Sequence, residues 1–77
     1  MFNVIHYIND DDFKIVYTNN MLNIVNYKKI NYMEDNKISL STIDFKVNIL
    51  GTDLRVKKLL DNEIAIVGNF SAIEFKK

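Results

Sequence analysis

The side chains that could do chemistry in this 77-residue sequence do not form a catalytic pattern. His6 is the one histidine and cysteine is absent, so neither a histidine cluster nor a thiolate metal site can form. Ser39, Ser41 and Ser71 have neither a suitably placed histidine nor the flanking glycines of a nucleophile elbow. No glycine-rich phosphate-binding loop occurs. We therefore expect a protein that is not an enzyme and that binds no cofactor.

Three consecutive aspartates, Asp10, Asp11 and Asp12, form the one acidic cluster that could suggest a calcium or magnesium site. Loops of that kind place their ligands at alternate positions and usually add a distal carboxylate. Consecutive carboxylates point in different directions, so we interpret this segment as a solvated turn without a metal.

The densest basic group comprises Lys46, Arg55, Lys57 and Lys58. On the outer face of a small barrel, such a group could bind single-stranded nucleic acid. Ten basic residues balance ten acidic ones, however, and a nucleic-acid-binding surface usually needs a basic excess. Nucleic-acid binding is therefore an alternative interpretation and not the preferred one.

The elements that must position any site are strands. From Lys37 to Phe75 apolar residues fall on alternate positions, which is typical of strands with one dry face. We expect strands near residues 2–8, 12–18, 21–26, 29–33, 37–42, 44–50, 53–59, 62–68 and 70–76. Their short connections favour antiparallel pairing. The predicted fold is all-β, a small antiparallel sandwich, roll or partly open barrel of about eight short strands. Its predicted core consists of Ile38, Leu40, Val47, Ile49, Leu54, Val56, Ile64, Ile66, Ile73 and Phe75.

Turn chemistry supports this division of the chain. Asn19-Asn20 suits a two-residue type I′ hairpin turn, because asparagine tolerates positive φ. Gly51 is expected in a turn between two strands, and Asp61-Asn62 in another two-residue turn. Gly68 occupies a position where an apolar side chain is due, which predicts a bulge or a bend.

Residues 1–77 are expected to form one domain, with residues 1–11 as an N-terminal extension for which strand and helix both stay open. The chain shows neither a secretory signal nor an apolar run that could cross a membrane, so a cytoplasmic location is expected. A core of this size without disulfides raises the expectation of a partner or of a second copy.

Some apolar residues lie out of phase with the predicted core, namely Val25, Tyr27, Ala65 and Val67. Strands that are dry on both faces suggest coverage by another layer or by a partner, and aromatic residues often anchor interfaces. These four residues are the candidate protein interface. Self-assembly through exposed edge strands near the termini is a further alternative.

Most of the chain, about residues 12–76, resembles the YabP/YqfC family of sporulation proteins. The segments that carry the resemblance are Leu40-Ser41-Thr42, Val47 to Leu54, Leu59, Glu63 to Phe70 and Ile73-Glu74-Phe75, with Gly51 and Gly68 in register. The Glu63-Ile64 pair is closer to the YqfC branch. Asp44 and Phe45 stand where many members have a glycine, and the segment before Asp12 matches nothing in the family pattern.

The resemblance implies a role in endospore formation in Firmicutes, in the mother cell, in later stages or in spore coat assembly. It also implies a protein partner, because members are often encoded beside a multi-pass membrane protein. The chain would then be a small cytoplasmic interaction module held peripherally at the forespore outer membrane. A homo-oligomer is the alternative that the small core leaves open. No catalytic residue is carried over from the family.

Overall fold

The computed structural model describes residues 12–77, which form six strands and no helix. The strands are β1 (Lys14–Thr18), β2 (Met21–Val25), β3 (Lys29–Met33), β4 (Lys37–Ser41), β5 (Lys46–Leu59) and β6 (Glu63–Lys76). They join in one sheet with the order β1-β2-β6-β5-β4-β3, and all neighbours are antiparallel. The all-β prediction is confirmed. The strand expected near residues 2–8 lies outside the described residues.

The predicted count of about eight short strands is wrong. The segments expected at 44–50 and 53–59 form the single strand β5, and those at 62–68 and 70–76 form the single strand β6. The two long strands stay paired from Lys46 opposite Lys76 to Leu59 opposite Ile64. Three register shifts interrupt this pairing, so the chain bends where the sequence suggested that it turned back.

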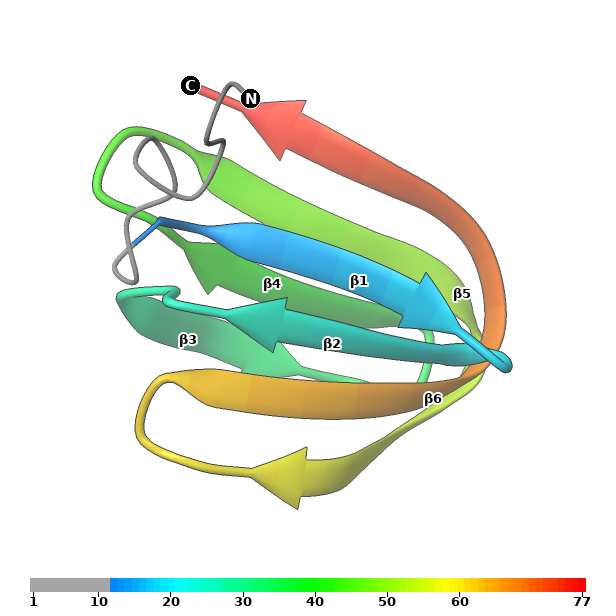
Figure 1. The fold of residues 1–77 in the computed structure, drawn as a ribbon. Coiled ribbons are helices and arrows are strands. Elements are labelled where there is room, and N and C mark those ends of the chain that lie inside the picture. The colour runs from blue at the N-terminus through cyan, green and yellow to red at the C-terminus, as the bar shows by residue number, and fades with distance from the viewer. Residues whose placement is uncertain (1–11) are drawn as a thin grey trace, which may run out of the picture.

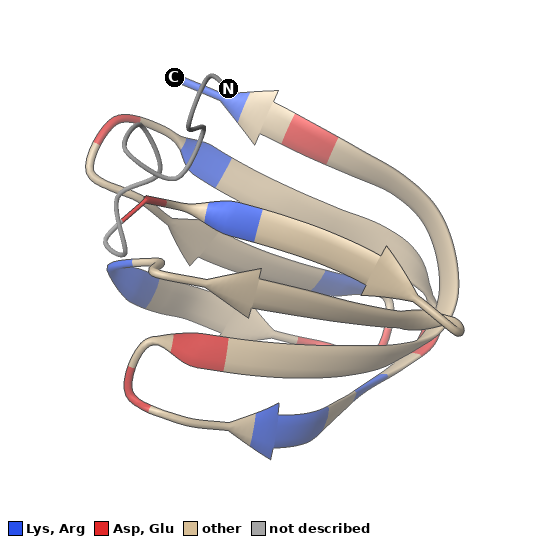
Figure 2. Cartoon of the chain, viewed as in Figure 1, with Lys and Arg blue, Asp and Glu red and all other residues tan. Residues whose placement is uncertain are grey.

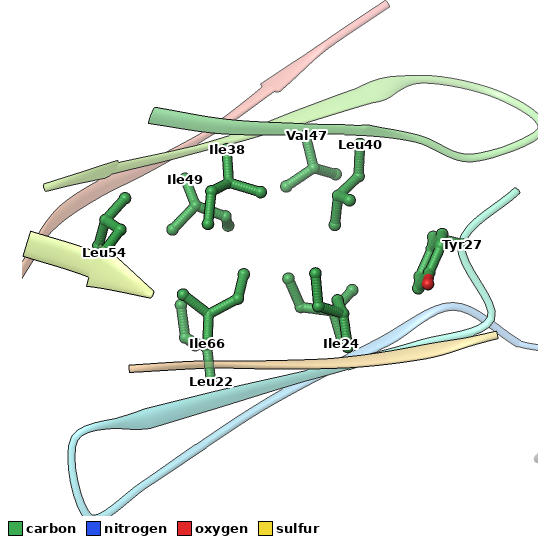
Figure 3. Close-up of a cluster of buried hydrophobic side chains, with 10 residues drawn as sticks. Leu22, Ile24, Tyr27, Ile38, Leu40, Val47, Ile49, Leu54 and Ile66 are labelled. Atoms are coloured by element: carbon green, nitrogen blue, oxygen red, sulfur yellow. The ribbon is translucent and has the colours of Figure 1, made fainter. Parts of the chain in front are cut away.

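The sheet is open and strongly bent (Figure 1). Strands β5 and β6 are long enough to run through the bend, so each contributes to both halves of the sheet. The first half of β6 pairs with β2, whereas the first half of β5 pairs with β4. The two halves face each other across the buried side chains in Figure 3. One continuous sheet, with β1 and β3 as the last strands in its order, therefore replaces the predicted sandwich, roll or partly open barrel.

We call the bend the waist and define it by Gly51, Asp53, Leu54 and Gly68. A Cβ atom on Gly51 would collide with the carbonyl oxygen of Asn69. A Cβ atom on Gly68 would lie 2.7 Å from the carbonyl oxygen of Asp53, and the φ angle of Gly68 is +144°. The backbones therefore touch here without room for a side chain, which explains the glycines.

The structure agrees with the role predicted for Gly68 but not with the turn predicted at Gly51. Gly68 lies opposite the register shift between Thr52 and Arg55, where the strand bends. Gly51 does not form the expected turn between strands, because β5 runs through it with a register shift beside it. Asn19 and Asn20 both have positive φ, as a type I′ turn requires.

The core lies between the two halves of the sheet. Seven of the ten expected core residues are buried: Ile38, Leu40, Val47, Ile49, Leu54, Ile64 and Ile66. Val56 and Ile73 are partly buried against them. Leu22, Ile24 and Tyr27 complete the buried cluster, although they were not among the predicted core residues.

Phe75 is the one predicted core residue that the structure places at the surface, with 60% of it exposed. Phe75 pairs with the buried Val47, so its side chain is on the core-facing side of the sheet, as the alternation predicts. The residue is nearly the last of β6, however, and its ring lies edge-on to that of the half-buried Phe45, at 6.0 Å between centroids. Phe75 therefore lies at the rim of the core.

Candidate docking groove

A shallow groove of about 740 Å³, wide open to solvent, lies where the β5–β6 turn meets the connection between β2 and β3. Both segments are at the left of Figure 1. The groove is lined by Tyr27, Lys28, Lys29, Ile30, Leu59, Leu60, Asp61 and Asn62. We call it the docking groove.

Backbone and asparagine hydrogen bonds fix the shape of the groove. The N–H of Leu60 donates to the carbonyl of Glu63 at 2.8 Å, which closes the turn around Asp61 and Asn62. The N–H of Asn26 donates to the carbonyl of Asn62 at 2.6 Å, and Nδ2 of Asn62 donates to Oδ1 of Asn26 at 3.0 Å. Asn26 has a φ of 68°, a conformation that asparagine tolerates better than most residues. Two turns far apart in the sequence are thus joined.

Tyr27 links the groove to the core. Its hydroxyl donates to the carbonyl of Leu60 at 3.1 Å, and the residue is only 7% exposed. Burial, assisted by the negative charge of Asp61, raises the pKa of the Tyr27 phenol above its usual value. The phenol therefore stays protonated at neutral pH and remains a hydrogen-bond donor to the turn.

The surface of the groove combines aliphatic and basic groups. Leu59 and Leu60 are each 50% exposed, although large aliphatic side chains usually avoid water. Lys28 and Lys29 are exposed on the opposite side, and the groove contains one acidic residue, Asp61. Residues 12–77 contain no cluster of acidic, histidine or cysteine side chains that could hold a metal. This arrangement suits the binding of an apolar group that is accompanied by a carboxylate.

The predicted interface residues do not form an exposed patch. Tyr27 belongs to the core cluster and Ala65 is 2% exposed, so neither is available to a partner. Ala65 pairs with Asn23 of β2 on one side and with Lys58 of β5 on the other. Val25 and Val67 are half-buried on β2 and β6.

The sequence reasoning assigned neither Leu59 nor Leu60 to an interface. Two adjacent leucines before a turn break the alternation, because consecutive side chains of a strand cannot both face the core. This break in the alternation is the sequence feature that could have indicated an exposed apolar site.

The structure does not bring Lys46 together with the other three basic residues proposed for nucleic acid. Lys46 starts β5, whereas Arg55, Lys57 and Lys58 lie in its second half, beyond the waist (Figure 2). Eleven residues separate Lys46 from Lys57, which is roughly 35 Å measured along the strand. In addition, Nζ of Lys58 lies 3.9 Å from Oε2 of Glu63.

The other candidate residues either form hydrogen bonds within the sheet or lie outside the described residues. Ser39 and Ser41 accept hydrogen bonds from Nδ2 of Asn31, at 3.1 Å and 2.9 Å. His6, Asp10 and Asp11 lie outside the described residues. No helix within residues 12–77 is long and apolar enough to cross a membrane.

Comparison with known proteins gives one match. The model of the YabP family matches residues 12–77, a range that includes all six strands and the docking groove. No curated protein and no solved structure gives a match.

Proposed function

The chain belongs to the YabP family, and on that premise we propose that it is a sporulation protein that acts by binding another protein. The observation that carries the binding role is the docking groove, where Leu59 and Leu60 are half exposed in a structured turn. Exposed aliphatic groups in a concave site are typical of protein-binding surfaces.

The proposed partner segment carries an aliphatic side chain beside an aspartate or a glutamate. The aliphatic group would cover Leu59 and Leu60, and the carboxylate would lie toward Lys28 and Lys29. Charges at the rim mainly orient the partner and speed its association, whereas the apolar contact provides most of the affinity.

The setting of this activity follows from what the family implies. We place the protein in the mother cell of endospore-forming Firmicutes, in later stages or in spore coat assembly. A multi-pass membrane protein is the proposed partner, so that the chain is held at the forespore outer membrane from the cytoplasmic side. The Glu63-Ile64 pair supports the YqfC branch within the family.

Replacing the gene in the sporulating host tests the proposal. Four strains are compared by heat-resistant spore counts: wild type, a deletion, a Leu59→Ser/Leu60→Ser double variant, and Met33→Ser as the control. Met33 is 46% exposed and does not line the groove. We expect the deletion and the groove variant to lower the counts together, and Met33→Ser to match wild type.

Each outcome has a defined meaning. Unchanged counts in the deletion strain would refute the sporulation role. A low count in the deletion strain with normal counts in the groove variant would refute the groove as the binding site. The purified groove variant must unfold within a few degrees of wild type, so that a loss of folding is not mistaken for a loss of binding.

A further inference from the structure

The edges of the sheet are not equally protected against an added strand. Exposed strand edges present unpaired N–H and C=O groups, and proteins usually guard them with bulges or with charged side chains. The register of β3 shifts between Ile30 and Tyr32. The second half of β5 contains a shift between Val56 and Lys58 and carries three basic residues, Arg55, Lys57 and Lys58.

Within the described residues, strand β1 is less protected. Its five residues pair with β2 in one uninterrupted register, from Lys14 opposite Val25 to Thr18 opposite Met21. The strand contains one charged residue, Lys14, and no proline. Val16 and Tyr17 are 47% and 58% exposed. The edge is therefore regular, largely uncharged and apolar.

We propose that β1 pairs with β1 of a second copy of this chain, which joins the two sheets edge to edge. An antiparallel pair with Val16 on a twofold axis places Lys14 opposite Thr18 of the other copy and Ile15 opposite Tyr17. No two like charges oppose each other within the strand. The pairing is isologous, as in most homodimers.

The charges of the protein permit this contact. The two Lys14 side chains would be about 14 Å apart along the paired strands, beyond the ~8 Å Debye length at physiological salt. The net charge of the chain is zero, so no long-range repulsion keeps two copies apart. Tyr17 is already placed by its own chain, through an edge-on contact with Phe70 at 6.0 Å between centroids.

A contact of five residues on each strand buries less than the 1,200 Å² or so that a stable interface needs. The dimer is therefore concentration-dependent. This inference does not depend on the docking groove, which is built from other strands, so the two can fail separately.

Sedimentation equilibrium between roughly 10 µM and 1 mM tests the pairing, since weak dimers dissociate in that range. We expect the weight-average mass of the full chain to rise from 9.0 kDa toward twice that value. Val16→Lys should keep the protein monomeric, because two lysines would then face each other on the axis.

Met33→Lys on β3 is the matched control, since Met33 is 46% exposed and Val16 is 47% exposed. Dimerisation of wild type and Met33→Lys but not of Val16→Lys, with equal far-UV circular dichroism, supports the proposal. A wild-type mass of 9.0 kDa at all concentrations, or an equal effect of the two lysines, overturns it.

Discussion

The waist lies midway along the paired strands β5 and β6, whereas the docking groove lies beside the turn that joins them, and the two are built in opposite ways. At the waist, backbone meets backbone around Gly51 and Gly68, with no room for a side chain. At the groove, hydrogen bonds hold two turns together while Leu59 and Leu60 stay half exposed. The difference separates the residues that determine the fold from those that are available to a partner.

Gly51→Ala tests the waist most severely. The new methyl group would collide with the carbonyl oxygen of Asn69, which belongs to the backbone of β6 and cannot rotate away. We expect a loss of more than about 5 kcal/mol, enough to unfold a domain of this size. Circular dichroism with urea titration measures the effect. Thr52→Ala, at the next and exposed position, should change stability by less than about 0.5 kcal/mol.

Gly68→Ala should have the next largest effect. Its φ of +144° is strained for any residue with a side chain, and its Cβ would lie 2.7 Å from the carbonyl oxygen of Asp53. Strain and overpacking together predict a loss of roughly 3–5 kcal/mol. Urea unfolding of the variant beside wild type gives the value. A neutral substitution would mean that the bend does not depend on this glycine.

Ile66→Ala and Leu60→Ala compare the core with the groove directly. Ile66 is fully buried, so its truncation should cost about 2–4 kcal/mol. Leu60 is half exposed, so the same change should cost under about 1 kcal/mol. The free energies of unfolding from urea titration decide the comparison. Equal losses would show that Leu60 is part of the core and not a free surface.

The sequence predicted most of what depends on local pattern. Alternating residues such as Ile38 and Leu40 indicated strands with one buried face, and both are buried. Asn19-Asn20 indicated a hairpin turn with positive φ, which the structure contains. These predictions succeeded because strand periodicity and turn conformation depend on residues close together in the chain.

The sequence could not reveal how distant segments meet. Gly51 indicated a turn because glycine can occupy the strained position of one, whereas the close approach of Asn69 is what requires a glycine here. Tyr27 was assigned to an interface because it lies out of phase with Leu22 and Ile24. The chain leaves β2 at Asn26, with a φ of 68°, and this change of direction carries the ring into the core. The docking groove, which combines residues 27–30 and 59–62, was invisible for the same reason.

Tyr27→Phe tests how firmly the groove is joined to the core. At neutral pH the variant loses the hydrogen bond to Leu60, which costs about 0.5–1.5 kcal/mol. The folded-state pKa of Tyr27 is raised, so folding favours the protonated phenol. Its contribution is complete below the unfolded pKa of about 10 and is lost as pH rises through the folded value.

Wild type should therefore lose more stability than Tyr27→Phe between about pH 8 and pH 11, the range over which a tyrosine ionises. Urea unfolding at both pH values measures the two losses. Tyr17→Phe, at a tyrosine that is 58% exposed, is the comparison variant. Equal losses in wild type and Tyr27→Phe would mean that the phenol contributes nothing that depends on its proton. The groove would then be held together by the backbone and asparagine hydrogen bonds of its two turns.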